Sequence, residues 1–287
     1  MIAPTIRVGV SHGWHQGRID ADAAVAFAAA TNDTNEVYLR GEAVPPLFTV
    51  SLVRPAMAGA VDGSVDPGAI KGARAHNVHA EHDLYLWNPV VPGMAVQWEL
   101  STYAARQTPA GVIVTQRALV TDVEGIALVE HFWSTIHPGG TIDADLGPAL
   151  ADHRFPEAAR DRLLGTRIFD IARDQTFRFA GVSGDHVPHA MDDEEARREG
   201  YSGKIVQGLC TLAMCGSAAV SVGAGGDPFR LRRLSARFSA PMYPRQQLAV
   251  AVCDAGRTGE GGRALAFEAT SNGVTCIRHG RAELLAD

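Results

Sequence analysis

The chain has 287 residues, of which 46% are hydrophobic and 20% are charged. These fractions are typical of a soluble globular protein and exclude a disordered or collagen-like chain. The formal net charge is -6, with 26 basic and 32 acidic residues. Because no basic field is available to bind a phosphate backbone, we expect no nucleic-acid partner.

The first twelve residues lack a basic segment followed by a long apolar run, so we expect no secretion signal. The four cysteines all fall in the second half of the chain and form no C-x-x-C pair. This pattern supports neither a zinc site nor a disulfide framework. We therefore expect reduced thiols and a cytoplasmic location.

The sequence contains an internal repeat. Three pairs of segments correspond, at offsets of 152, 152 and 148 residues: 27–33 with 179–185, 89–92 with 241–244, and 124–125 with 272–273. Residues 139–160 are rich in glycine, proline and charged side chains, as is typical of a linker. We therefore predict two related domains, residues 1–150 and residues 160–287.

Both halves show the same order of predicted elements. A short helix carries Asp33 or Asp185, a longer apolar helix begins near residues 45–48 or 205–208, and extended segments with hairpin turns follow. Residues 205–226 are uncharged, but five glycines and several polar side chains interrupt them, so we expect a buried helix and no membrane span. This order indicates an α+β fold in which two antiparallel sheets, packed side by side, each wrap one long helix.

The second half also holds a candidate catalytic constellation. Asp185 and nearby histidines lie in a tight turn, and Gly208 begins the long apolar helix. An aspartate and a histidine can hold and deprotonate a water molecule, while a glycine amide at a helix start can stabilise an oxyanion. Such groups would add water to, or remove it from, the position beside a thioester carbonyl. The alternative is that Asp185 caps a helix and that His186 and His189 are surface residues.

These segments resemble the MaoC-like (R)-specific enoyl-CoA hydratases and dehydratases of the double-hotdog type, such as the peroxisomal hydratase 2 domain. The resemblance rests on SGDxxPxxxD, the following GY, IVQGLCT and ARFSAPMYP in the second half, and on PPLF, the His79 segment and NPVVPG in the first. It implies a double-hotdog fold with a hydratase-like C-terminal half. The N-terminal half is then degenerate and accommodates the acyl chain.

The resemblance also implies roles for particular residues. The catalytic aspartate of the family falls on Asp185, and the glycine whose amide contacts the thioester oxygen falls on Gly208. Pro188 and Asp192 match the motif as well. Gln207, beside this glycine, and Arg237 are the other residues that we expect to bind substrate.

Three positions depart from the family pattern. Val187 replaces an asparagine, Ala190 replaces the catalytic histidine, and Gln207 replaces the histidine before the glycine. His189 lies one place early, and one residue on a helix turns a side chain by about 100°. We take His189 as the candidate partner of Asp185. The first half retains Asp33 but places Tyr38 where the histidine would stand, and this is the next pair to test.

His76, His79 and His82 lie close together in the sequence, beside acidic residues, as in some metal sites. If this segment is a strand, side chains alternate between its faces, so His79 should point away from the other two. Glycine-rich dinucleotide and P-loop motifs and the serine-hydrolase motif are also missing from the sequence. We therefore predict neither a metal nor a cofactor.

Five arginines lie in a stretch without acidic residues between Asp227 and Asp254: Arg230, Arg232, Arg233, Arg237 and Arg245. Such a patch would bind the phosphates of coenzyme A or the phosphopantetheine of an acyl carrier protein. The alternative is a solvated face of the protein.

We thus predict a lyase acting on an enoyl or 3-hydroxyacyl thioester of fatty-acid or polyketide metabolism, with coenzyme A or acyl carrier protein as the carrier. Asp185 is the base, His189 its candidate partner and Gly208 the oxyanion donor. Two alternatives stay open: an altered hotdog protein that binds or tailors an acyl intermediate, and a thioesterase. Whether the chain forms a homodimer is also open.

Overall fold

The structure, a computed structural model, describes the backbone of residues 4–74 and 77–286, and the side chains of the same residues apart from 58–63. The first half contains β1 (Ser11–Arg18), α1 (Ala21–Ala30), α2 (Glu36–Leu39), α3 (Val50–Ser64), β2 (Val78–Leu86), β3 (Ala95–Thr108), β4 (Gly111–Asp122) and β5 (Ala127–Pro138). The second contains η1 (Glu157–Ala159), β6 (Leu163–Asp170), α4 (Gln175–Ser183), α5 (Pro188–Met191), α6 (Asp193–Arg198), α7 (Gly208–Gly223), η2 (Pro228–Arg230), β7 (Leu231–Phe238), β8 (Gln247–Arg257), β9 (Arg263–Ser271) and β10 (Val274–Leu284).

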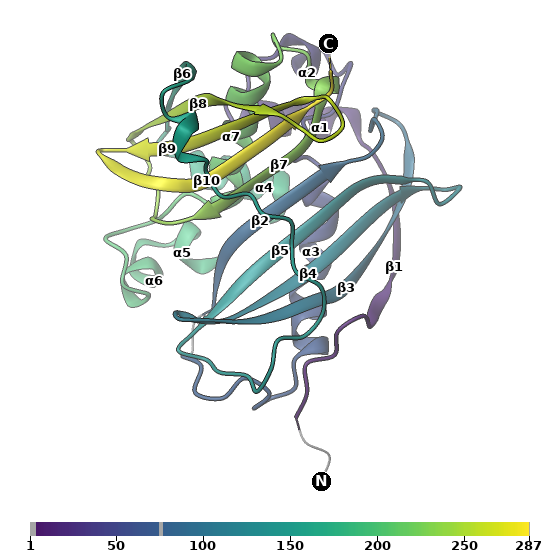
Figure 1. Cartoon of the computed structure of the whole chain (residues 1–287), viewed down its shortest axis with the longest axis vertical. Helices are drawn as coiled ribbons and strands as arrows, with labels where there is room; N and C mark the ends of the chain where they lie inside the picture. The colour runs from purple at the N-terminus through teal and green to yellow at the C-terminus, as the bar shows by residue number, and fades with distance from the viewer. Residues whose placement is uncertain (1–3, 75–76, 287) are drawn as a thin grey trace.

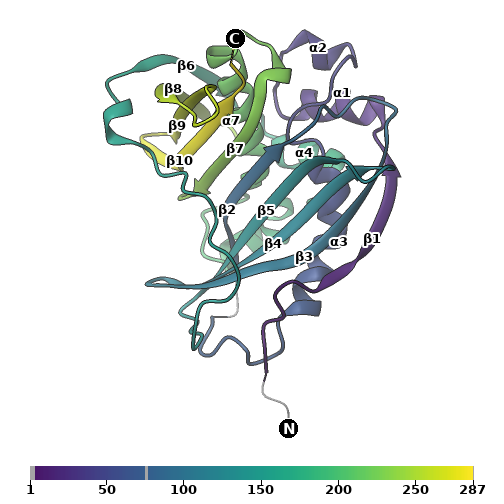
Figure 2. The ribbon, with the colours of Figure 1, turned by 45° about the vertical axis from the view of Figure 1, so that its right-hand side comes forward.

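The ten strands form one antiparallel sheet in the order β1-β3-β4-β5-β2-β7-β10-β9-β8-β6. Read inward from the two edges, the halves have the same order, because β1 to β5 correspond to β6 to β10. The strands β2 and β7 pair at the centre, with Leu84 opposite Leu234 (Figures 1 and 2). The two predicted sheets are therefore joined edge to edge, which satisfies backbone groups that two separate sheets would leave unpaired.

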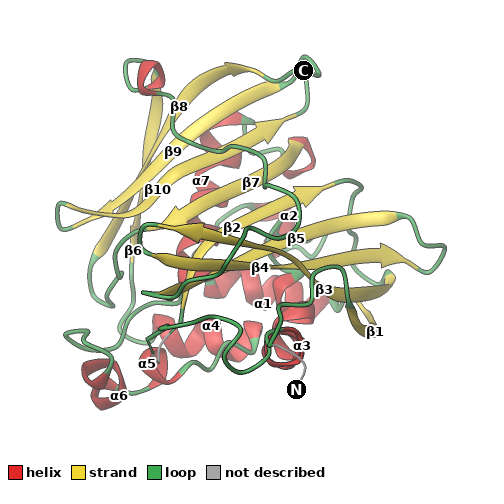
Figure 3. Ribbon diagram, turned by 60° about the horizontal axis from the view of Figure 1, so that its bottom comes forward, coloured by secondary structure: helices red, strands yellow, loops and turns green. Residues whose placement is uncertain are grey.

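The long helices lie against one face of this sheet, as Figure 3 shows. Helix α3 contacts β1, β3 and β4, whereas α7 contacts β6 to β10. Most side chains of α7 are buried on every side of the helix. The prediction of an α+β fold in which each half wraps one apolar helix is confirmed. Within the described residues, no helix combines the length and the apolarity needed to cross a bilayer.

The repeat is also visible in side-chain contacts between the halves. Phe27 and Phe179, which are 152 positions apart, are both fully buried and meet with ring centroids 5.8 Å apart. They come from α1 and α4, which pack against each other. The prediction that these two helices carry Asp33 and Asp185 is wrong. Both aspartates lie in the turns that follow the helices.

A buried ion pair crosses the junction of the halves. Arg233 of β7 donates to both carboxylate oxygens of Asp83 of β2, at 3.0 and 2.7 Å, and its other terminal nitrogen lies 3.1 Å from Glu283. Arg233 is 4% exposed and Asp83 2%. This arginine of the acid-free stretch thus belongs to the interior of the junction and not to a surface patch.

Candidate active site

The backbone around Asp185 is held in place by the end of helix α4. Gly184 adopts a left-handed conformation, with φ of 70°, and its amide caps the helix by donating to Ala180. The amide of Asp185 then donates to the hydroxyl of Ser183 at 3.2 Å. The chain reverses at Gly184, so that the Asp185 side chain, itself 6% exposed, enters a cavity.

An arginine from the other half contacts this carboxylate. Arg54 of α3 donates from Nη2 and Nε to Oδ1 of Asp185, at 2.8 and 3.1 Å. Oδ2 accepts no hydrogen bond from any described residue. Arg54 was not among the predicted site residues. The signal for it is a lone arginine in the early part of a largely apolar helix, whose one other charge, Asp62, lies near the end.

Gln207 and Gly208 form the start of α7, directly beside Asp185. The Gln207 side-chain amide donates to the backbone carbonyls of Asp185 at 3.0 Å and Thr176 at 3.1 Å, which ties the Asp185 turn to the helix start. The amide of Gly208 donates to no acceptor in the described chain. A Cβ on Gly208 would lie 2.9 Å from the Phe238 ring, so this position leaves room for little more than glycine.

The predicted site residues Asp185, His189, Gln207, Gly208 and Arg237 all line one cavity of about 590 Å³. The first half completes its wall through side chains that include Arg54, Met57, His79, Trp133 and Ile136. The cavity therefore lies at the junction of the halves. It combines a carboxylate, a free helix amide and a predominantly apolar surface, as is typical of a small-molecule site.

His189 lies on the wall of this cavity but is turned toward Glu199. Its Nδ1 lies 2.8 Å from Oε2 of Glu199, and its ring meets the Tyr201 ring at a centroid distance of 5.7 Å. Among the described residues, no hydrogen bond or ion pair joins His189 to Asp185. Ala190, at the family position of the catalytic histidine, is fully buried.

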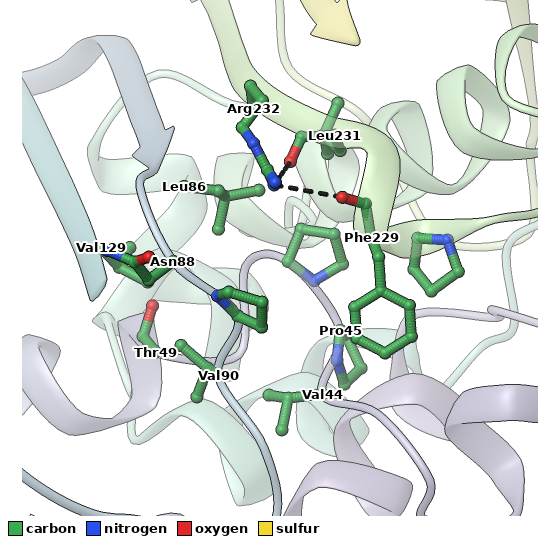
Figure 4. A pocket seen from close by; sticks show the side chains of 13 residues that line it. Val44, Pro45, Thr49, Leu86, Asn88, Val90, Val129, Phe229, Leu231 and Arg232 are labelled. Carbon is green, nitrogen blue, oxygen red and sulfur yellow. Dashed lines mark hydrogen bonds between the residues drawn. The ribbon is translucent and has the colours of Figure 1, made fainter. Parts of the chain in front are cut away.

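Arg237 is exposed at the cavity and forms no ion pair with any described carboxylate. Its neighbours in the sequence face elsewhere. Arg232 bonds back to the carbonyls of Phe229 and Leu231 beside a second, much smaller cavity of about 40 Å³ (Figure 4). The acid-free stretch therefore does not form one arginine patch, and Arg237 alone among these arginines lines the larger cavity.

The prediction that His79 points away from His82 is wrong. The pairing of β2 with β5 shifts register between His79 and Glu81, and this bulge returns His79 to the face of His82, with ring centroids 5.4 Å apart. His76 lies outside the described residues. Within the described residues, no three candidate ligands are arranged to hold a metal ion.

The corresponding pair in the first half has a different setting. Asp33 lines a separate cavity of about 500 Å³ with Arg167 and Ser217, and burial raises the pKa of its carboxyl. Tyr38 is fully buried and does not line this cavity. Burial also raises the pKa of the Tyr38 hydroxyl well above its ordinary value. Asp33 and Tyr38 therefore do not face a common space.

Comparisons with known proteins agree with this architecture. A family model described as a MaoC like domain matches residues 156–275. The 3-hydroxyacyl-thioester dehydratase Y of Mycobacterium tuberculosis is 26% identical over 237 residues, which cover 80% of this chain and 78% of that one. A MaoC-like dehydratase from Phytophthora capsici has a similar fold, with a TM-score of 0.81 at 16% identity over 98% of each chain.

A further solved structure, from Mycobacterium tuberculosis, is described as a double hotdog fold. It matches with a TM-score of 0.60 at 11% identity, over 98% of this chain and 96% of the other. The predicted double-hotdog fold is therefore confirmed. The chain thus matches a MaoC like domain in its second half and has a double-hotdog fold throughout.

Proposed function

We propose that the protein adds water to an enoyl thioester, or removes it from a 3-hydroxyacyl thioester, with (R) stereochemistry at C3. One observation carries this proposal: Asp185 and Gly208 line the same cavity, and neither Oδ2 of Asp185 nor the amide of Gly208 is hydrogen-bonded to another described residue. The named activity of the mycobacterial relative is of the same kind.

In this proposal the thioester carbonyl accepts a hydrogen bond from the Gly208 amide. Negative charge develops on that oxygen as C2 gains carbanion character, and the start of α7 stabilises it because helix amides and the helix dipole both favour an anion there. Asp185 takes a proton from water through Oδ2. Arg54 keeps the carboxylate in place through Oδ1, so the second oxygen stays available.

The carrier and the acyl chain take opposite parts of the cavity. Arg237, exposed and without an ion pair among the described residues, binds a phosphate of coenzyme A or of a carrier protein's phosphopantetheine. The acyl chain lies against Met57, Trp133 and Ile136 of the first half. We accordingly divide the chain into an acyl-accommodating domain, residues 1–150, and a catalytic domain, residues 160–287. We place this enzyme in the cytoplasm.

One observation favours a second candidate, a protein that binds or tailors an acyl intermediate without hydrating it. The family position of the catalytic histidine is the buried Ala190, and His189 is engaged with Glu199. The cavity itself would serve binding equally well. The two candidates therefore differ only in whether water is activated.

The deciding experiment offers the protein crotonyl-CoA and longer trans-2-enoyl-CoA esters, follows the loss of the conjugated thioester absorbance, and determines the configuration of the product by chiral chromatography. The proposal expects (3R)-hydroxyacyl-CoA. Binding of these esters without hydration would favour the second candidate, and release of free coenzyme A would indicate a thioesterase instead.

A further inference from the structure

A base that activates water works best when a second group holds the other hydrogen of that water. The family position for this group is the buried Ala190, which has no polar side chain. Two histidines line the cavity, and the proposed function uses neither. His189 is engaged with Glu199, which leaves one other imidazole. It is His79, which comes from β2 of the first half.

The His79 ring packs against two aromatic rings that neighbour the functional groups already described. It stacks on Trp133, with centroids 4.1 Å apart and an interplanar angle of 9°, and the Arg54 guanidinium lies 5.7 Å from the same Trp133 ring. On another side it meets Phe238 at 4.7 Å. Phe238 is the side chain that a Cβ on Gly208 would meet. One aromatic ring thus separates His79 from the oxyanion amide, and another separates it from the arginine that holds Asp185.

The Nε2 atom of His79 is buried and has no hydrogen-bond partner among the described residues. Burial and the nearby charge of Arg54 lower the pKa of His79 to about 3. The imidazole is therefore neutral at physiological pH, with one ring nitrogen able to accept a hydrogen bond. A buried acceptor without a partner is costly in a folded protein unless something occupies it.

The side chains that pack behind the His79 ring also indicate that the ring is held in a fixed position. His82 meets His79 edge to face, its Nε2 lies 3.1 Å from Nδ1 of His131, and Nε2 of His131 lies 2.8 Å from the hydroxyl of Thr49. All three supporting residues are buried, and Thr49 directly precedes α3, the helix that carries Arg54. These contacts run from His79 through His82 and His131 to Thr49, and Figure 4 shows Thr49 at the smaller cavity.

We propose that His79 is a catalytic residue that holds the nucleophilic water together with Asp185, in place of the histidine that Ala190 replaces. This inference rests on the proposed function. One hydrogen of the water is bound by Oδ2 of Asp185 and the other by Nε2 of His79. The water oxygen forms the bond to C3 while Asp185 takes the first proton, and C2 then takes that proton from Asp185. The second hydrogen stays on the new hydroxyl, and His79 remains neutral throughout.

Two substitutions separate this role from a structural one. His79→Leu keeps much of the volume but removes the acceptor, whereas His79→Gln keeps an acceptor oxygen near the position of Nε2. We expect His79→Leu to lower kcat for crotonyl-CoA hydration about 100-fold, at the lower end of the range for acid–base groups. We expect His79→Gln to restore part of this loss. The affinity for butyryl-CoA, which cannot be hydrated, should change less than threefold in both variants.

His137→Leu is the matched control. Burial lowers the pKa of His137 too, and its Nε2 is also buried without a partner in the described chain, but it does not line the cavity. Its kcat should stay within threefold of wild type. If the wild type is active and His79→Leu keeps its kcat, the inference is overturned while the proposed function stands. If His79→Leu loses activity but Asp185→Asn does not, the base is misassigned, and the inference that His79 acts together with Asp185 is overturned as well. A wild type that hydrates no enoyl thioester overturns both.

Discussion

Arg54 and Asp185 belong to different halves of the repeat, and both hydrogen bonds between them end on the same carboxylate oxygen, Oδ1. The carboxylate is thereby fixed, while its other oxygen accepts no hydrogen bond from any described residue. Helix α3 of the first half thus holds the carboxylate of a site whose aspartate and helix amide lie in the second.

The Arg54 contact can be tested by its removal. Arg54→Met should lower kcat for enoyl-CoA hydration because Asp185 loses its orientation, and it should lower the free energy of unfolding by about 1–3 kcal/mol because a largely buried carboxylate loses two charge-assisted hydrogen bonds. Urea titrations and steady-state rates would measure both effects. Arg40→Met, which removes exposed ion pairs with Glu36 and Glu42, is the control and should change neither. Full activity of Arg54→Met would argue against this role.

The junction between the halves depends on Arg233. Its ion pair with Asp83 is buried, so Arg233→Met should lower the free energy of unfolding by about 3–5 kcal/mol, because the aspartate is left charged without a partner. Adding Asp83→Asn should recover part of that loss. Denaturant titration of the single and double variants gives the comparison. A loss no larger than that of an exposed arginine, such as Arg154, would contradict a structural role for the pair.

Acid should destabilise the fold through its buried histidines. Burial lowers the pKa of His131 to about 3, and burial with two neighbouring imidazoles lowers that of His82 well below 6.5. The unfolded chain binds these protons near pH 6.5 and the folded chain does not, so the free energy of unfolding falls as the pH drops from about 6.5 toward 3. Each histidine contributes up to about 1.4 kcal/mol per pH unit.

His131→Gln should therefore make the dependence of stability on pH shallower between pH 6.5 and 4. His186→Gln, at an exposed position, should leave the slope as in the wild type. Thermal unfolding at a series of pH values measures the slopes. Equal slopes for His131→Gln and the wild type would show that His131 is protonated in the folded protein.

Arg237 is predicted to bind the carrier. Arg237→Ala should weaken binding of an acyl-CoA and reduce its salt dependence, because a charge contact that salt screens has been removed. Isothermal titration at several salt concentrations would show both changes. Dephospho-coenzyme A esters, which lack one phosphate, would identify the phosphate concerned. Unchanged affinity across the salt series would leave Arg237 as a solvated side chain.

The repeat made much of the fold predictable, because related halves must place their apolar helices and hairpins alike. Their fusion into one sheet was not predictable in this way. The strands β2 and β7 pair through backbone hydrogen bonds, and such pairing leaves no periodic pattern in the sequence. His79 was assigned to the wrong face because strand alternation fails at a bulge. Arg54 was missed because its partner lies 131 positions away, in a turn of the other half.

The central claim is that Asp185 is the base for water in this cavity, and the kcat of Asp185→Asn on an enoyl-CoA substrate tests it most directly. Asparagine keeps the size of the side chain but cannot take the proton. General-base catalysis contributes about 10²- to 10⁴-fold, so we expect a kcat lower by at least 100-fold with little change in affinity for butyryl-CoA. Wild-type turnover that survives Asp185→Asn would contradict the account.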